Sequence, residues 1–122
     1  MTADKIITKA VNLLGYTDDE GNITSPKIQT IALTALNTVY SDLYYLLNEE
    51  GFKEIGSASE EVKLPERIVN NVMVYGVASF IAQGIGDANA QQFFTLVYNS
   101  RRKSATVQTT ITDTLPAIND GE

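Results

Sequence analysis

LPERIVNNVMVYGVASFIAQGI, residues 64–85, is the stretch that decides the fold. Pro65 suits a helix start, because the N–H it lacks is one that the first turn leaves unpaired anyway. A helix that is apolar nearly all round is buried on several sides, so we expect a central helix here. Gly76 in its middle indicates close approach by another helix, since glycine is otherwise unfavourable there. The apolar positions are Ile68, Val69, Val72, Met73, Val74, Tyr75, Val77, Ala78, Phe80, Ile81, Ala82 and Ile85.

Three further helices are expected around this one. Thr2 can cap a first helix that Gly15 ends, and Ser25-Pro26 begins a second that runs to about Asn48. Asp87 can cap a fourth helix that stops near Ser104. Residues 49–63 break the helical period, and a short hairpin and an ordered loop both remain open there. The fold class is therefore mainly α, a small antiparallel four-helix bundle over residues 1–104.

The C-terminal residues 105–122 have a different composition. The run ATVQTTITDTLPAI at 105–118 is rich in Thr and β-branched residues, and Val107, Thr109 and Ile111 share a parity. This pattern favours an extended strand. The rest of the chain offers no sheet, and a lone strand leaves backbone groups unpaired. Residues 105–122 are thus expected to form an extended arm that is disordered alone or adds to another chain.

Composition excludes several kinds of function. The 122 residues correspond to one domain, carry a formal net charge of −6 and include neither Cys nor His. Disulfides, thiolate nucleophiles, Cys/His zinc sites and imidazole catalysis are therefore excluded. An acidic chain is not steered toward nucleic acid or anionic membranes. We find neither a signal peptide nor a run of roughly 20 apolar residues, so no membrane association is expected.

Three motifs imitate functional sites without matching them. The turn Asp18–Asn22 has its glycine one place too early for a calcium-binding EF-hand loop. Gly84-Ile85-Gly86 lacks the third glycine and the preceding strand of a dinucleotide-binding loop. The pairs Glu49-Glu50 and Glu60-Glu61 are typical of solvated surface. We therefore predict no catalytic, cofactor-binding or metal-binding residue, and no enzymatic activity.

Two sets of residues leave alternatives open. Arg101, Arg102 and Lys103 either supply favourable charge at a helix C-terminus or contact nucleic acid. Five tyrosines are either anchors for a partner or core residues with satisfied hydroxyls: Tyr40, Tyr44, Tyr45, Tyr75 and Tyr98.

From Leu64 to Lys103 the chain resembles the helical head-to-tail connector (adaptor) proteins of tailed bacteriophages, which form a ring beneath the portal. The resemblance rests on five motifs: Leu64-Pro65-Glu66, Tyr75-Gly76-Val77-Ala78, Gly86-Asp87, Phe93-Phe94 and Tyr98-Asn99. The order of elements is similar too: a short helix, a long helix, a loop, two packed helices and a C-terminal arm.

The resemblance implies a structural virion protein at the head-tail interface, made in the host cytoplasm and without cofactors. It implies a homo-oligomeric ring, usually of twelve copies, which joins the portal protein to a downstream tail or stopper protein. DNA would pass through the lumen, near Arg101, Arg102 and Lys103, without specific binding. The implied tail-side loop contains Phe52, Ile55 and Val62. The implied portal-binding arm comprises Thr106, Val107, Gln108, Thr109, Thr110, Ile111 and Leu115.

One alternative reading uses the same features. A small helical adaptor or regulator outside any virion would also have a bundle and an arm that folds on a partner. Deleting residues 106–122 would then abolish one specific pull-down rather than virion assembly.

Overall fold

The computed structural model describes the backbone of residues 1–47 and 50–120, and side chains within residues 1–47 and 50–105. Its elements are α1 (Ala3–Leu14), α2 (Pro26–Leu46), α3 (Glu66–Ile68), the π-helical turn η1 (Val69–Met73), α4 (Val74–Ile85) and α5 (Ala88–Asp120). The α3, η1 and α4 segments follow one another as a single helical run. The prediction of a mainly helical chain is confirmed, and the described residues contain no strand.

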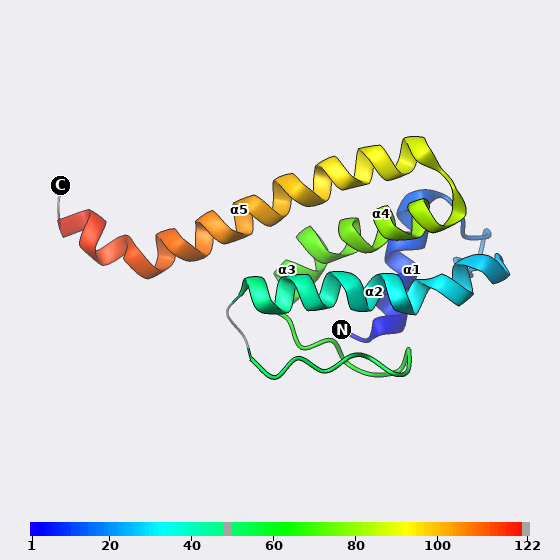
Figure 1. Cartoon of the computed structure of the whole chain (residues 1–122), viewed down its shortest axis with the longest axis horizontal. Coiled ribbons are helices and arrows are strands. Elements are labelled where there is room, and N and C mark those ends of the chain that lie inside the picture. Colours follow the sequence, from blue (N-terminus) through cyan, green and yellow to red (C-terminus); the bar gives the residue numbers. More distant parts are fainter. Residues whose placement is uncertain (48–49, 121–122) are drawn as a thin grey trace.

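The helical run around α4 lies at the centre of the bundle. It packs against α1, α2 and α5. Figure 1 shows α2, α4 and α5 alongside one another in alternating directions, whereas α1 crosses them. Burying each large apolar side chain contributes roughly 1.5–3 kcal/mol, so this shared interior dominates stability. The largest fully buried side chains are Ile6, Val11, Ile28, Leu36, Val39, Leu43, Val69, Met73, Val77 and Ile81.

The stretch Glu66–Ile85 also has the length and composition to cross a membrane. In the bundle, however, 61% of its most hydrophobic window is buried against the rest of the chain. That burial is typical of a core helix.

Gly76 lies where other helices approach α4 closely, as the sequence indicated. A Cβ atom built there would lie 2.7 Å from the Tyr98 ring of α5 and 3.0 Å from Val39 of α2. Real Cβ atoms essentially never lie as close to another atom as this one would lie to the Tyr98 ring. The missing side chain thus allows α4 to pack against two helices at one level.

The predicted starts of α1, α2 and α5 and the predicted end of α4 are present. Thr2 and Ser25 accept capping hydrogen bonds from the Lys5 and Ile28 amides, at 3.4 and 3.3 Å. Gly86 ends α4 with φ of 77°, a left-handed conformation that favours glycine. Asp87 then caps α5 by accepting a hydrogen bond from the Ala90 amide at 3.1 Å.

Residues 50–63 form an ordered loop, and in their described part no hairpin is present. The loop is tied to the N-terminus: the Val62 amide donates to the Met1 carbonyl (3.0 Å), and the Ala3 amide donates to the Glu60 carbonyl (2.9 Å). The Asn37 side chain of α2 donates to the Ile55 carbonyl and accepts from its amide, at 2.9 and 2.7 Å. These contacts satisfy backbone groups that a hairpin would otherwise pair.

The expected extended arm is wrong, because the backbone continues as helix α5 to Asp120. The helix does not stop near Ser104, and it runs without a break across the boundary expected between residues 104 and 105. A helix satisfies its own backbone hydrogen bonds, whereas a strand here would find no partner in the described chain. In a helix, Thr, Val and Ile are less favourable than alanine by no more than about 0.7 kcal/mol per residue. That cost is too small to outweigh the unpaired backbone groups of a strand without a partner.

Candidate interaction surfaces

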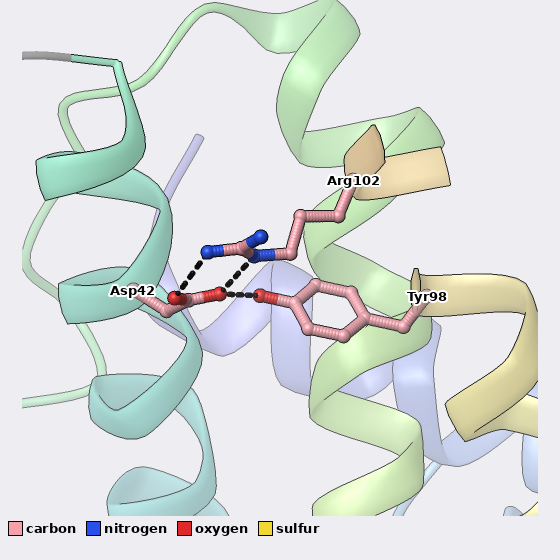
Figure 2. Close-up of polar contacts among 3 residues, drawn as sticks. All are labelled: Asp42, Tyr98 and Arg102. Carbon is pink, nitrogen blue, oxygen red and sulfur yellow. Dashed lines mark hydrogen bonds and ion pairs between the residues drawn. The ribbon is translucent and has the colours of Figure 1, made fainter. Parts of the chain in front are cut away.

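One polar cluster joins α5 to α2 (Figure 2). Arg102 donates two hydrogen bonds to Asp42, from Nε to Oδ2 at 2.7 Å and from Nη2 to Oδ1 at 2.9 Å. The Tyr98 hydroxyl donates a third, to Oδ2 at 2.6 Å. Such a forked pair is stronger and more directional than a neutral hydrogen bond. The cluster therefore fixes where α5 lies on the bundle.

The electrostatics of this cluster keep it charged. The hydrogen bond from Arg102, helped by that from Tyr98, lowers the pKa of Asp42, although partial burial opposes the shift. Burial, followed by the hydrogen bond to Asp42, raises the pKa of Tyr98 far above its ordinary value. The Asp42 carboxylate is thus ionised and the Tyr98 hydroxyl protonated at neutral pH, as the observed hydrogen bonds require.

The basic run 101–103 lies in the interior of α5, so the helix C-terminus interpretation is wrong. Arg101 donates from Nη1 to the Asn71 carbonyl at 3.3 Å, and its guanidinium carbon lies 4.8 Å from the centre of the Tyr75 ring. Arg102 binds Asp42, and Lys103 is exposed. A contact of this run with DNA stays a prediction.

A groove of about 540 Å³ lies between the start of the central helical run and α5. Arg67 and Arg101 flank it, and Ile68, Val72 and Ala105 line it with apolar surface. The guanidinium groups can donate hydrogen bonds to an acceptor but cannot serve as a general base near neutral pH. Among the side chains that the structure describes, no cluster of three or more Asp and Glu residues is placed so that it could hold a metal ion.

The residues expected to form a tail-side loop lie largely inside. Ile55 and Val62 are only 6% and 3% exposed and belong to the hydrophobic core. Phe52 is partly buried, with its ring centre 5.0 Å from that of Tyr40 and 5.6 Å from that of Tyr44. These residues hold the loop against the core. A contact with a tail protein would therefore be made mainly by the exposed residues of the loop, and the tail-side role stays a prediction.

The tyrosines divide between the two alternatives. Tyr40 and Tyr98 are core residues with satisfied hydroxyls, since Tyr40 accepts from the Lys63 amide at 3.0 Å and Tyr98 donates to Asp42. Tyr44 donates to the Glu50 carbonyl at 3.0 Å, and Tyr75 packs beside Phe94. Tyr45 is 57% exposed and is the one that could anchor a partner.

The predicted arm residues lie on α5. The backbone of Thr106, Val107, Gln108, Thr109, Thr110, Ile111 and Leu115 is helical, and their side chains lie outside the described part of the structure. Earlier on the same helix, Phe93 and Leu96 are 59% and 65% exposed, the highest values for large hydrophobic side chains in the described residues.

Asp42 is a residue that the sequence did not single out. Two signals pointed to it: a lone carboxylate in the largely apolar helix α2, and the four-residue spacing of Tyr98 and Arg102, which places both on one helix face. Their pairing with Asp42 spans about half of the chain and has no local signature.

Comparison with known proteins gives no significant match to a protein-family model, a curated protein or a solved structure.

Proposed function

We propose that this chain is a non-catalytic structural subunit of a head-to-tail connector in a tailed bacteriophage. Copies would form a ring under the portal, join it to the next tail or stopper protein, and let DNA pass without specific binding. Each copy would contact its neighbours through two different surfaces, as a closed head-to-tail ring requires. Many weak contacts around such a ring add up to high avidity.

The motifs that carry the resemblance occupy positions that shape the bundle. Glu66 begins the central helical run directly after Pro65, and Gly76 lies where that run meets α2 and α5. Gly86 and Asp87 make the corner between α4 and α5. These positions support a shared bundle geometry, which is what the sequence likeness implies.

The observation that carries the proposal is the projection of α5. Figure 1 shows the C-terminal part of this helix extending well beyond the other helices, so its last turns lie away from the core of their own bundle. An element that leaves its own core is suited to contact another molecule. Because its backbone hydrogen bonds lie within the helix, we propose contact through a helix face rather than strand addition.

The proposal is tested by imaging. The purified chain would be mixed with portal rings encoded in the same genome and examined by negative-stain electron microscopy. We expect a ring of added density on one end of the portal. A chain that forms no ring and never caps the portal would contradict the connector function. If instead the chain captures a host protein, and loses it on deletion of residues 106–122, the regulator alternative is favoured.

A further inference from the structure

The groove between the start of the central helical run and α5 has the chemistry of a carboxylate-binding site. Ile68, Val72 and Ala105 give it a buried apolar floor, because they are only 3–6% exposed. Arg67 and Arg101 flank this floor, and no carboxylate is among the lining residues that the structure describes. A guanidinium group beside apolar surface binds a carboxylate more strongly than it would in open water.

The two guanidinium groups are available to a partner. Within residues 1–47 and 50–105, neither Arg67 nor Arg101 forms an ion pair with a carboxylate. Arg101 is nevertheless held in place, by its hydrogen bond to the Asn71 carbonyl at 3.3 Å and by the Tyr75 ring beneath its guanidinium group. A donor that is already fixed loses less conformational entropy when it binds.

An unusual backbone lies at the same place. The π-helical turn η1 supplies Asn71 and Val72 to the wall of the groove. Such turns are rare inside helices and frequently lie at functional sites. The backbone of the central run therefore singles out the groove independently of its charge.

The chain carries a matching acidic segment in the turn between α1 and α2. Asp18, Asp19 and Glu20 follow one another there and are exposed. Asp18 fixes the turn, since its Oδ1 accepts from the amides of Glu20 and Asn22 at 2.9 and 2.8 Å. The side chains of Asp19 and Glu20 have no hydrogen-bond or ion-pair partner in the described part of the chain. The turn thus presents two adjacent carboxylates on a fixed backbone.

We propose that the groove of one copy binds the acidic turn of a second copy, with Arg67 and Arg101 paired to Asp19 and Glu20. The groove volume of about 540 Å³ is within the usual range for a binding site and can hold a few side chains. The charges are complementary, which fixes the register of the two copies and suppresses wrong contacts.

The places of the two surfaces favour a contact between copies over one within a single chain. Figure 1 shows the turn between α1 and α2 at the end of the bundle where α5 begins, whereas the groove lies toward the end where α5 leaves it. A contact between two different surfaces is heterologous, and repeating it gives a closed ring when the rotation closes. An acidic protein is also a better partner than nucleic acid for a chain with a net charge of −6.

This contact rests on the proposed function for its arrangement as a closed ring. Exposed ion pairs are weak singly, so one groove and one turn would associate only transiently in dilute solution. Around a ring every copy uses both surfaces, and the contacts reinforce one another. A test must therefore trap the contact.

Cysteine cross-linking traps it, because the native chain has no cysteine. Full-length Ser104→Cys, in the groove, and Asn22→Cys, in the turn, would be oxidised separately and as a mixture. We expect dimers in the mixture alone, since the groove of one copy meets the turn of another. Lys5→Cys, exposed on α1, replaces Asn22→Cys in the control mixture and should give none.

A chain with both cysteines tests the arrangement. Each copy then joins one neighbour through its groove and another through its turn, so we expect a ladder of oligomers. A double variant that stops at the dimer would overturn the heterologous contact. A Ser104→Cys and Asn22→Cys mixture that cross-links no better than the control mixture would overturn it too.

Charge reversal tests the ion pairs. Arg67→Glu in the Ser104→Cys chain should lower the cross-link yield several-fold, and Glu20→Arg in the Asn22→Cys chain should restore it. Lys103→Glu is the matched control, because Lys103 is exposed and lies outside the groove lining, so its reversal should change little. A yield unchanged by Arg67→Glu, or lowered equally by Lys103→Glu, would refute the assignment.

The inference and the connector function fail separately. If wild-type chain caps portals but gives no cross-link between copies, the groove contact is refuted and the connector stands. If Arg67→Glu then abolishes capping, the groove belongs to the portal. A cross-linked ladder from a chain that never caps a portal would support the contact and remove the connector.

Discussion

At the scale of single residues, Asp42 is the side chain on which the position of α5 depends most. Its one carboxylate accepts hydrogen bonds from both Tyr98 and Arg102, which lie on successive turns of α5. The Tyr98 ring also fills the space beside Gly76. Polar and apolar contacts between the helices are thus coupled through one tyrosine.

Asp42→Asn should destabilise the bundle at neutral pH by about 1 kcal/mol. This is less than is usual for hydrogen bonds to charged groups, because the Asp42 side chain is 38% exposed and water screens the interaction. The folded-state pKa of Asp42 is lowered, so its contribution is fully present above the unfolded-state pKa of about 3.9. It is lost as the pH falls through the lower folded-state value. Thermal melts should therefore show a difference between wild type and variant at pH 7 that shrinks below about pH 4.

The control for that series is Glu54→Gln, in the exposed loop, which should change little at either pH. The melts would be compared at pH 7 and at about pH 2.5. If the difference in stability between wild type and Asp42→Asn were the same at both pH values, the stabilising role of the ionised Asp42 carboxylate would be contradicted.

Gly76→Ala should destabilise by roughly 1–3 kcal/mol, the usual cost of overpacking, despite the better helix propensity of alanine. The new Cβ would meet Tyr98, whose ring cannot move away without weakening its bond to Asp42. Gly56→Ala is the control, because its Cβ would find one ordinary contact, at 3.4 Å. Urea unfolding of both variants measures the effect, and equal midpoints would rule out the close approach.

At the scale of elements, the helix starts and ends could be predicted where the signal is local. Ser25 with Pro26, and Gly86 with Asp87, determine backbone hydrogen bonds within a few residues of themselves. The C-terminal segment could not be read in this way, because Thr and β-branched residues only weakly prefer strand and the absence of a sheet partner outweighs them. The sequence alone does not decide between a loop and a hairpin at residues 50–63, because the groups that hold this segment, on Met1 and Asn37, are distant in sequence.

Truncation after Ala105 should leave the bundle nearly as stable as the full chain. Tyr98 and Arg102, which hold α5 to α2, are retained, and the removed residues project beyond the other helices (Figure 1). We expect the melting temperature to change by less than about 4 °C, equivalent to about 1 kcal/mol. The helical circular dichroism signal should fall in proportion to the helical residues that the truncation removes. A much larger loss of melting temperature would mean that residues 106–122 belong to the core.

At the scale of the whole molecule, the two parts of α5 have different surroundings. The first part of this helix, with Phe94 and Tyr98, completes a core centred on α4. The second part continues past the bundle (Figure 1). The central claim is therefore that this protein acts by assembly, through the projecting part of α5.

Native mass spectrometry of portal rings mixed with the chain tests that claim most directly. Full-length protein should raise the portal mass by a whole ring of copies, whereas protein truncated after Ala105 should leave it unchanged although its bundle is folded. A portal mass unaltered by the full-length chain, or raised equally by the truncated one, would contradict the account.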